Sequence, residues 1–578
     1  MICHDDVKGF TLSHNPQTIG CFSCHGGHPF EADKNQAHKG MVLIPGNLAG
    51  ATRSCGTAKC HPDITKRINT SLMSTLSGMI SVDRFVFNEQ DNPDALTTVH
   101  HLGSSAAGEH LKNLCVRCHL GNPKTETGPI TDESRGGGCV ACHLNYSDIA
   151  IANWFEHQSN RFDTSYLNYH PALSLQVSNN HCFGCHSRSG RISTNYEGWH
   201  ETLIPADSMP DDKNYRLIED TRVFKYIRDD VHHHLGMSCI DCHNSYELMG
   251  DGTLYAHEED QVEIQCRDCH LTGKPRLLKQ QQLDNESAVI ASLRFGNTTD
   301  RQFLATGKKN RPLINTYYYN DTAFMIGKDS KKIYTLKPPA PICTGGEAHS
   351  DLSCSSCHAA WAPSCIGCHN KYDPDEPGYN MQDNKEQTGS WVEYTSEYNA
   401  HLPALGIRYN GDSKSVIPVI PGMILTIDVN SFNKKAHDSL IFKRLFAPVA
   451  PHTTQTEGRS CKSCHNNPVA LGYGEGELNY IVEGHSGRWI FTPKYQDNVN
   501  DGLPEDAWTG FLKSRAGKTS TRSDVRPFSV AEQRKILMVG ACLTCHNEDS
   551  RVIKQSLIDF KKVWSHKTRK CIVPFGTK

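Results

Sequence analysis

The sequence has no hydrophobic run long enough to cross a membrane. Its longest apolar stretch, Val416–Ile427, contains two prolines and is shorter than the roughly 20 residues that a membrane-spanning helix needs. The formal net charge is only −3, so there is no basic field that would favour nucleic acid. An N-terminal signal segment and low-complexity linkers are also missing. These absences argue against a transmembrane protein and against a nucleic-acid-binding protein.

Cysteine and histidine, in contrast, are abundant, with 25 Cys and 32 His in 578 residues. Most of the cysteines occur in the pattern Cys-x-x-Cys-His, which is the attachment signal for haem c. The two cysteines form thioethers with the porphyrin, and the histidine binds the iron. Chance at this composition would give about 0.06 such pentapeptides, whereas the chain has ten. An eleventh site has four residues between its cysteines, Cys55 and Cys60.

The eleven attachment sites use 22 cysteines. In chain order, the attachment cysteines are Cys21 and Cys24, Cys55 and Cys60, Cys115 and Cys118, Cys139 and Cys142, Cys182 and Cys185, Cys239 and Cys242, Cys266 and Cys269, Cys354 and Cys357, Cys365 and Cys368, Cys461 and Cys464, and Cys542 and Cys545. The predicted proximal iron ligands are His25, His61, His119, His143, His186, His243, His270, His358, His369, His465 and His546.

Two other uses of Cys-x-x-Cys fit the sequence less well. Zinc sites combine two such units per metal and do not require a histidine directly after each one. A redox-active dithiol would occur once in a chain rather than eleven times. We therefore predict eleven covalently bound haem c groups.

Three cysteines remain outside these sites: Cys3, Cys343 and Cys571. Cys3 and His4 fit the end of a twelfth site whose first cysteine would precede Met1; the alternative is a stray Cys-His pair. For Cys343 and Cys571 we expect a disulfide bond, with two buried free thiols as the alternative. Because thioether attachment of haem implies export, we interpret the N-terminus as mature or truncated. We expect an extracytoplasmic protein, located in the periplasm, at the outer surface or outside the cell.

Twenty histidines remain after the eleven proximal ones and His4 are set aside, which is enough to close every iron with a second imidazole. Methionine, the alternative axial ligand, raises the reduction potential, but the chain has 11 Met without recurring placement. A ligand close to an attachment site in a Gly/Pro-rich loop loses little chain entropy. On this basis the preferred distal ligands are His14, His38, His101, His110, His170, His200, His232, His257, His349 and His452, with His181, His233, His234 and His485 in reserve. We expect ordinary surface or core roles for His157, His401, His437 and His566.

The fold class that this pattern predicts is a multihaem cytochrome c with mostly loops and short α-helices wrapped around a haem chain and with minor β insertions. Residues 1–275 hold seven attachment sites, or eight if Cys3 belongs to one. Residues 276–345 form a haem-free β-rich insertion, 346–375 a central dihaem pair, 376–460 a haem-free β-containing insertion, and 461–578 a C-terminal dihaem region.

Several segments carry local structural signals. Pro312–Tyr319 and Lys332–Leu336 are predicted to be strands, and Val416–Val429 a hairpin or edge strand around Pro421. Ser529–Val539 begins with a capping serine and has apolar residues at helical spacing, so it is predicted to be a helix.

The central pair, Cys354–His369, has six residues between the histidine of its first site and the first cysteine of its second. Such a segment spans at most roughly 25 Å when it is fully extended, so the two haems are expected side by side. We predict that this pair joins the N-terminal sites to the C-terminal ones, with His349 as a nearby distal ligand.

Six segments together resemble large multihaem c-type cytochromes of metal-reducing and other respiratory bacteria. They are GEHLKNLCVRCHLG, HCFGCHSRSGRISTNYEGWHE, DVHHHLGMSCIDCHNSYELMGDG, LSCSSCHAAWAPSCIGCHNKYD, APVAPHTTQTEGRSCKSCHNNPVALGYG and VGACLTCH. The resemblance implies electron transfer outside the cytoplasm, including roles at the outer surface or in cytochrome filaments. Octahaem enzymes share this haem-dense style, but the present chain has more sites than they do. It also lacks a Cys-x-x-Cys-Lys site like that of the pentahaem nitrite reductases.

The sequence leaves three functions open. The first is electron transfer along eleven or twelve mainly bis-histidine haems to other redox proteins, to copies of itself, or to an extracellular metal or mineral. With about −1 for each haem the loaded protein would carry about −14, which favours cationic partners. The second is an oxidoreductase that acts on a small nitrogen or sulfur compound at one haem with an open coordination position. The third is a filament subunit in which terminal haems stack between copies.

Overall fold

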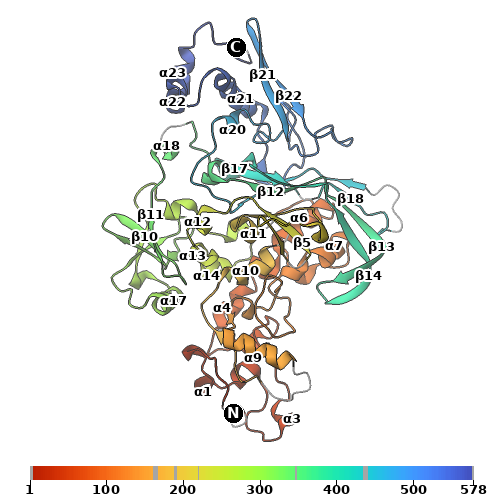
Figure 1. Ribbon diagram of the computed structural model, residues 1–578, viewed down its shortest axis with the longest axis vertical. Helices are drawn as coiled ribbons and strands as arrows, with labels where there is room; N and C mark the ends of the chain where they lie inside the picture. The colour runs from red at the N-terminus through yellow and green to blue at the C-terminus, as the bar shows by residue number, and fades with distance from the viewer. Residues whose placement is uncertain are drawn as a thin grey trace.

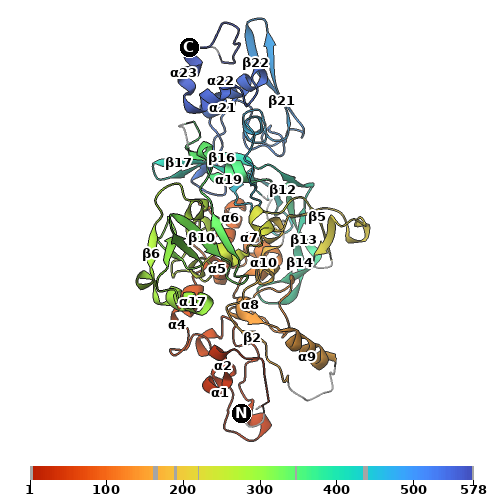
Figure 2. The same ribbon diagram turned by 60° about the vertical axis from the view of Figure 1, so that its left-hand side comes forward.

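The computed structural model describes residue 4 and residues 6–159, 167–187, 192–218, 221–344, 348–422, 424–433 and 440–575. The molecule is elongated, and the two chain ends lie at opposite ends of its long axis (Figure 1). The first helices of the chain lie at one end of this axis and the β21–β22 hairpin (Gly476–Glu483 and Ser486–Pro493) at the other, and both views agree on this (Figure 2).

The N-terminal end consists mainly of helices. They are α1 (Pro16–Ile19), α2 (Phe22–His25), α3 (Lys34–Ala37), α4 (Pro62–Ile68), α5 (Leu72–Thr75), α6 (Ser77–Val86), α7 (Ala106–Leu114), α8 (Val140–His143) and α9 (Asp148–Ser159), with the short strands β1 (Leu144–Asn145) and β2 (Ala172–Leu173).

The middle of the chain alternates short helices with small antiparallel sheets. Its helices are α10 (Asn179–His186), α11 (Ile192–Tyr196), α12 (Val231–His234), α13 (Cys239–Cys242), α14 (Ser245–Leu248), α15 (Glu258–Gln261), α16 (Cys266–Cys269), α17 (Asn285–Phe295) and α18 (Pro341–Thr344). Its strands are β3 (Trp199–Glu201), β4 (Tyr215–Ile218), β5 (Arg222–Tyr226), β6 (Leu277–Lys279), β7 (Gln302–Ala305), β8 (Pro312–Leu313), β9 (Thr316–Tyr319), β10 (Thr322–Ile326) and β11 (Ile333–Leu336).

The remaining part is richest in strands. They are β12 (Ala362–Ile366), β13 (His369–Asn380), β14 (Lys385–Tyr394), β15 (Glu397–His401), β16 (Ala404–Asn410), β17 (Ser413–Pro421), β18 (Thr426–Asp428), β19 (Leu440–Phe442), β20 (Phe446–Pro448), β21, β22 and β23 (Val525–Arg526). The helices here are α19 (Cys354–His358), α20 (Lys462–His465), α21 (Val530–Cys545), α22 (Arg551–Ile558) and α23 (Phe560–Ser565).

The predicted fold class is wrong in its proportions. Helix makes up 30% and strand 22% of the chain, with many antiparallel sheets, so the protein is not mostly loops and short helices with minor β insertions. The longest hairpin shows why: β13 has the sequence HNKYDPDEPGYN and pairs with β14 along most of its length. Its prolines and acidic residues have low intrinsic strand propensity, so the sequence does not indicate a strand here. The strand forms because strand formation depends more on pairing partners than on intrinsic propensity.

Local predictions fared better. The helix predicted over Ser529–Val539 is confirmed as α21. Ser529 caps this helix, and its side chain accepts a hydrogen bond from the Glu532 amide. The strands predicted at Pro312–Tyr319 and Lys332–Leu336 occur as β8, β9 and β11. Val416–Val429 does contain strands, β17 and β18, but the predicted hairpin or edge position is wrong. The two strands belong to different sheets, and each lies between two other strands.

Most attachment motifs form a single helical turn, as in α2, α8, α13 and α16. Residues three apart lie on the same face of a helix. The Cys-x-x-Cys spacing therefore directs both sulfurs to one side, with the histidine at or just after the end of the turn.

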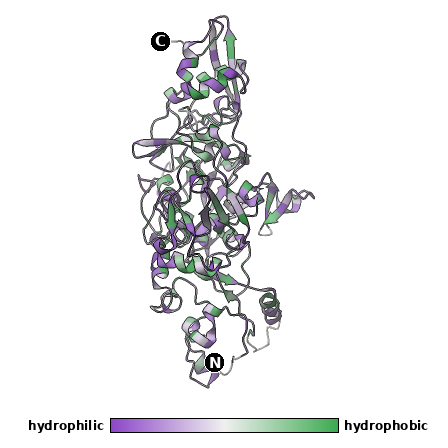
Figure 3. Ribbon diagram, turned by 90° about the vertical axis from the view of Figure 1, so that its left-hand side faces the viewer, coloured by the Kyte–Doolittle hydropathy of each residue, from purple (hydrophilic) through white to green (hydrophobic). Residues whose placement is uncertain are grey.

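Apolar packing is divided among several small clusters rather than gathered in one core, and apolar residues are spread over many short elements (Figure 3). The largest clusters pack α6 and α7 against β13 and β14 around Trp391, and α21 against the β21–β22 hairpin around Trp489. Among the described residues, none before Leu76 belongs to a cluster. In that segment Leu12 and Phe30 are almost fully exposed.

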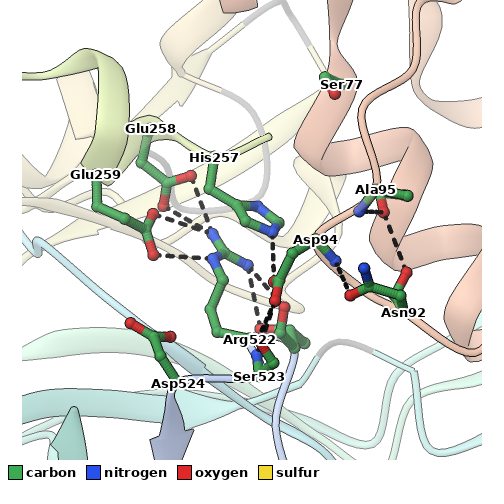
Figure 4. Close-up of polar contacts among 12 residues, drawn as sticks. Ser77, Asn92, Asp94, Ala95, His257, Glu258, Glu259, Arg522, Ser523 and Asp524 are labelled. Atoms are coloured by element: carbon green, nitrogen blue, oxygen red, sulfur yellow. Dashed lines mark hydrogen bonds and ion pairs between the residues drawn. The ribbon is translucent and has the colours of Figure 1, made fainter. Parts of the chain in front are cut away.

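A buried arginine ties the two halves of the chain together (Figure 4). The Arg522 guanidinium donates to both carboxylate oxygens of Glu258, at 3.1 and 3.0 Å, and its Nε donates to Glu259 at 2.9 Å. The next residue, Ser523, donates its amide to Asp94 at 3.2 Å. Arg522 is 9% exposed. Of its two carboxylate partners, Glu259 is largely buried, whereas Glu258 is mostly exposed.

Replacement of Arg522 by methionine should lower the free energy of unfolding of the haem-loaded protein by about 1.5–3 kcal/mol, because the largely buried carboxylate of Glu259 loses one of its two charged hydrogen-bond partners. Arg488→Met is the matched control, since the Arg488–Glu483 pair is mostly exposed and such pairs contribute at most about 1 kcal/mol. Denaturant unfolding followed by haem absorbance measures both variants. Equal losses of stability would show that the Arg522 network does not hold the halves together.

Candidate haem-binding sites

Six pairs of histidine rings face each other across a gap of constant width. Their ring centres are 6.0–6.4 Å apart. Each pair joins one histidine that directly follows a cysteine in a motif with one histidine from elsewhere in the chain. The pairs, motif histidine first, are His4–His38, His61–His14, His25–His170, His270–His232, His243–His452 and His465–His349.

This spacing fits a metal ion held between two imidazoles. With metal–nitrogen bonds of about 2 Å and a ring radius of about 1 Å on each side, the ring centres would lie roughly 6 Å apart. Direct aromatic contact can occur at the same distance, so the distance alone is not decisive. The composition of the pairs is a second argument for a shared metal ion. None of the six pairs joins two motif histidines or two histidines from outside the motifs.

Hydrogen bonds at the other ring nitrogen prepare these histidines for iron. Nδ1 of His25 lies 2.8 Å from the Val42 carbonyl, that of His170 2.6 Å from Pro171, and that of His465 2.9 Å from Ile536. A carbonyl oxygen can only accept a hydrogen bond, so the proton is on Nδ1 and Nε2 keeps its lone pair. Metal-binding histidines are typically oriented by such a bond. The same arrangement occurs at His38, His119, His143, His270, His358 and His452.

All six non-motif histidines of the pairs belong to the ten preferred distal candidates. His14 precedes the Cys21 site but faces His61, the histidine of the next site. His349 precedes the central pair but faces His465 of a C-terminal site. Distal histidines therefore lie opposite sites other than the nearest one in sequence. Their role as ligands remains a prediction, now with a defined partner for each.

The other four preferred candidates, His101, His110, His200 and His257, are in none of the six pairs. His110 is buried, with Nδ1 3.1 Å from Asp83 and Nε2 3.3 Å from Asn370. Nε2 of His257 is 2.9 Å from Asp94, beside the Arg522 network (Figure 4). Both residues sit in hydrogen-bonded protein surroundings and do not face a motif histidine in any of the six pairs.

His200 is buried on β3, near Trp361 and the attachment site at Cys365. Burial is the main cause that lowers its pKa, to about 4, and the Tyr398 backbone, which it faces, works against the shift. Tyr398 is paired with Cys365 across the β12–β15 ladder. A neutral, buried imidazole at this position suits an iron ligand for the Cys365 site.

One histidine outside the predicted set, His100, lies near a motif histidine. Burial lowers the pKa of His119, and the neighbouring His100 lowers it further. The prediction chose His101 rather than His100, because two adjacent histidines give no local signal that separates them. Among the reserves, His181 lies near His143 and contributes to the lowered pKa of that ring, after burial and His61.

The other reserves and the histidines expected to have ordinary roles are spread over the surface. His233 and His234 lie 3.1 and 3.6 Å from Asp229, and His401 is 3.6 Å from Glu475. His485 lies in the exposed turn between β21 and β22. His157 is on α9, and His566 follows α23. His437 and Cys3 lie outside the described residues.

The neighbouring histidines offer a direct test. In the fully reduced protein, His100→Ala should open one iron to carbon monoxide, whereas His101→Ala should leave the spectrum unchanged. Carbon monoxide difference spectra, scaled to the haem content, measure the effect. The opposite result would assign the ligand to His101, as the sequence suggested.

Thiols of different attachment sites also meet. Each site is named below by its first cysteine. Where two thiols form a hydrogen bond, their sites must be direct neighbours. The bonded pairs are Cys55–Cys139, Cys118–Cys185, Cys182–Cys239 and Cys266–Cys354.

Further contacts extend this set. Burial raises the pKa of the Cys24, Cys269 and Cys357 thiols, and a nearby thiol of another site raises each further: Cys55, Cys242 and Cys464, respectively. In the same way Cys142 lies close enough to Cys182 to raise the pKa of that thiol, after its hydrogen bond to Cys239 and burial. The Cys461 and Cys542 sites meet through Glu548, whose carboxylate accepts hydrogen bonds from the Cys461 and Lys462 amides at 3.2 and 3.0 Å. Nearly all of the attachment sites are thus connected.

The expected disulfide is not formed. Cys343 and Cys571 are both exposed free thiols. Cys343 lies near Cys357, whereas Cys571 lies near Cys542. Each thiol is thus adjacent to a different attachment site, which is the physical reason that they do not bond to each other.

Among the described residues, three or more His, Cys, Asp or Glu side chains nowhere gather as a metal site. A haem iron does not require such a group, because the porphyrin supplies four of its ligands and the protein only one or two. The part of the chain that the structure describes has no helix with the length and apolarity for crossing a membrane. Comparison with protein-family models, curated proteins and solved structures finds no match to this chain.

Proposed function

We propose that this protein is an extracytoplasmic electron conduit that holds eleven haem c groups, or twelve if Cys3 belongs to a site, most of them between two histidines. The observation that carries the proposal is the set of six histidine pairs with ring centres 6.0–6.4 Å apart. When bound, a haem iron closed by two imidazoles exchanges single electrons and has no free position for a substrate.

The thiol contacts support a continuous row of sites along the long axis of the molecule. Each step rests on a contact between a cysteine or an adjacent residue of one site and the next site. In order from the N-terminal end, the row is Cys21, Cys55, Cys139, Cys182, Cys239, Cys266, Cys354, Cys461 and Cys542. Because the termini lie at opposite ends of the molecule (Figure 1), this row connects the two ends.

Two sites lie beside the row. The Cys115 site contacts it through the Cys118–Cys185 thiol pair. The Cys365 site follows Cys354 closely in sequence, but β12 leads the chain away to the sheet formed with β15. The sequence predicted that both sites of the central pair join the N-terminal sites to the C-terminal ones. The thiol contacts support this role for the Cys354 site alone, which lies near Cys266 on one side and near Cys464 on the other.

The division of the apolar core agrees with this proposal. A chain of 578 residues would ordinarily build large continuous cores, whereas here the clusters are small, and those found in the described residues begin only at Leu76. The N-terminal segment nevertheless carries the Cys21 and Cys55 sites. Covalently attached porphyrin would supply the apolar surface that this segment lacks.

The N-terminal end also favours assembly of copies into a filament. The His4–His38 pair lies at the extreme N-terminus, and Leu12 and Phe30 in the same segment are 95% and 96% exposed. Large apolar side chains at one tip of an elongated molecule suit contact with the opposite tip of another copy. Electron microscopy of the native protein tests this; single particles at high concentration would count against it.

Carbon monoxide distinguishes a conduit from an enzyme. If every iron is closed by two histidines, addition of carbon monoxide to the reduced wild-type protein should leave its spectrum essentially unchanged. A spectral change that corresponds to one or more whole haems would instead support an oxidoreductase that acts on a small nitrogen or sulfur compound. A haem content far below eleven per chain would contradict both functions.

A further inference from the structure

Two neighbouring sites in the middle of the row differ from the others in how their histidines are held. Nδ1 of His243, at the Cys239 site, lies 2.8 Å from the carboxylate of Glu247. Nδ1 of His232, which faces His270 of the Cys266 site, lies 2.8 Å from the carboxylate of Asp230. The side chains of Glu247 and Asp230 are 1% and 3% exposed. At both sites a buried carboxylate thus orients one of the two facing imidazoles.

In the other pairs the described partner of Nδ1 is neutral. It is the Ser13 hydroxyl for His14, and a backbone carbonyl for both histidines of the His25–His170 pair and for His465 and His38 in theirs. The partners of the two special histidines, His452 and His270, also donate to carbonyls. Among the pairs whose Nδ1 contacts are described, a carboxylate therefore occurs only at the Cys239 and Cys266 sites.

The backbone holds both carboxylates in their ionised form. Glu247 accepts hydrogen bonds from the amides of Glu263 and Ile264, both at 2.6 Å. Asp230 accepts from the amides of Thr454, at 2.6 Å, and His232, at 2.8 Å. Multiple amide donors stabilise a carboxylate, so each imidazole faces a full negative charge.

A carboxylate partner makes an imidazole a stronger electron donor to the metal that it binds. A stronger donor stabilises ferric over ferrous iron, and hydrogen bonding around the ligand is one of the means by which proteins set haem potentials. The buried Lys328 opposes this effect at the Cys239 site, where its ammonium is 3.1 Å from the His243 carbonyl. Lys328 contacts the backbone of His243, whereas Glu247 bonds to the imidazole itself.

We propose that Glu247 and Asp230 give the Cys239 and Cys266 sites the lowest reduction potentials of the protein, below those of the sites on either side. The two sites are neighbours, since Cys242 lies near Cys269. They would form an energetic barrier in the middle of the row and divide it into an N-terminal and a C-terminal electron pool. This inference rests on the proposed conduit function.

The test uses Glu247→Gln and Asp230→Asn in the full-length, haem-loaded protein, followed by potentiometric titration of the haem absorbance. Each variant should make one haem easier to reduce, by about tenfold in its ferric–ferrous equilibrium, which is 59 mV for one electron. Unchanged potentials at full haem content would overturn the inference and leave the conduit function intact. A wild-type protein whose haem irons are not closed by two histidines would instead contradict the conduit itself.

Asp241→Asn is the matched control. Asp241 is 2% exposed and lies within the same attachment motif, but it accepts from the amide of Ser238, at 2.9 Å, and that of Lys328, at 2.6 Å. Its replacement removes a nearby buried charge and leaves the bond to His243 in place. A shift clearly smaller than that of Glu247→Gln supports the inference, whereas an equal shift contradicts the role of the hydrogen bond.

A measurement on the wild type does not depend on whether the variants fold. The protein is reduced in steps, and its ferric signals are followed by electron paramagnetic resonance. The last two haems to become reduced should broaden each other's signals, because their sites are neighbours. Final signals from haems without such interaction would place the lowest potentials elsewhere and overturn the inference.

Discussion

Replacement of Cys354 and Cys357 by alanine should reduce electron transfer between the two ends of the molecule by orders of magnitude. The Cys354 site contacts Cys266 of the preceding site and Cys464 of the following one, and no other described thiol contact joins these two parts of the row. The double variant should lose one haem per chain. Conductance of single molecules attached through tags at both termini measures the effect.

The same substitution at Cys115 and Cys118 provides the control. It also removes one haem, but that site touches the row only through the Cys118–Cys185 pair. We therefore expect the Cys115 and Cys118 variant to retain most of the conductance. If both double variants lose conductance equally, the row is not the path of the electrons.

The second large effect is expected at His452. Its ring centre is 6.3 Å from that of His243, and its Nδ1 is 2.7 Å from the Ala450 carbonyl, so Nε2 is directed to the shared metal position. His452→Ala should open one iron per chain and change it from low spin to high spin. In the reduced variant, carbon monoxide should bind one haem out of the total.

His257→Ala is the matched control, because His257 was an equally good candidate in sequence. Its Nε2 is 2.9 Å from Asp94, within the network around Arg522. The variant should lose stability and leave carbon monoxide binding unchanged. An open iron in His257→Ala, or none in His452→Ala, would contradict the pairing.

The attachment sites and many of the histidines of the candidate haem sites could be predicted from sequence because their chemistry is local. The Cys-x-x-Cys-His motifs are read directly from the sequence, and a glycine- or proline-rich neighbourhood led to His14, His38 and His170. The pairing of His243 with His452 could not be foreseen, since it depends on the tertiary fold. The choice between His100 and His101 also depends on which ring the short helix turns towards His119.

The fold was less predictable than the sites. The strands that surround the central pair, such as β13 with its prolines and acidic residues, are specified by their partners in the hairpin. The Asp83–His110 and Asp94–His257 contacts join distant segments, so the hydrogen-bond partners of these two candidate ligands could not be foreseen from the sequence near them. The predicted disulfide failed for the same reason, because Cys343 and Cys571 are adjacent to different attachment sites.

The most direct test of the account is the haem content of the exported protein, measured by intact mass together with the pyridine haemochrome spectrum. The eleven complete motifs predict eleven covalently attached haems per chain, and twelve if Cys3 completes another site. A mass that corresponds to unmodified cysteines, or to bound zinc without haem, would contradict the central claim.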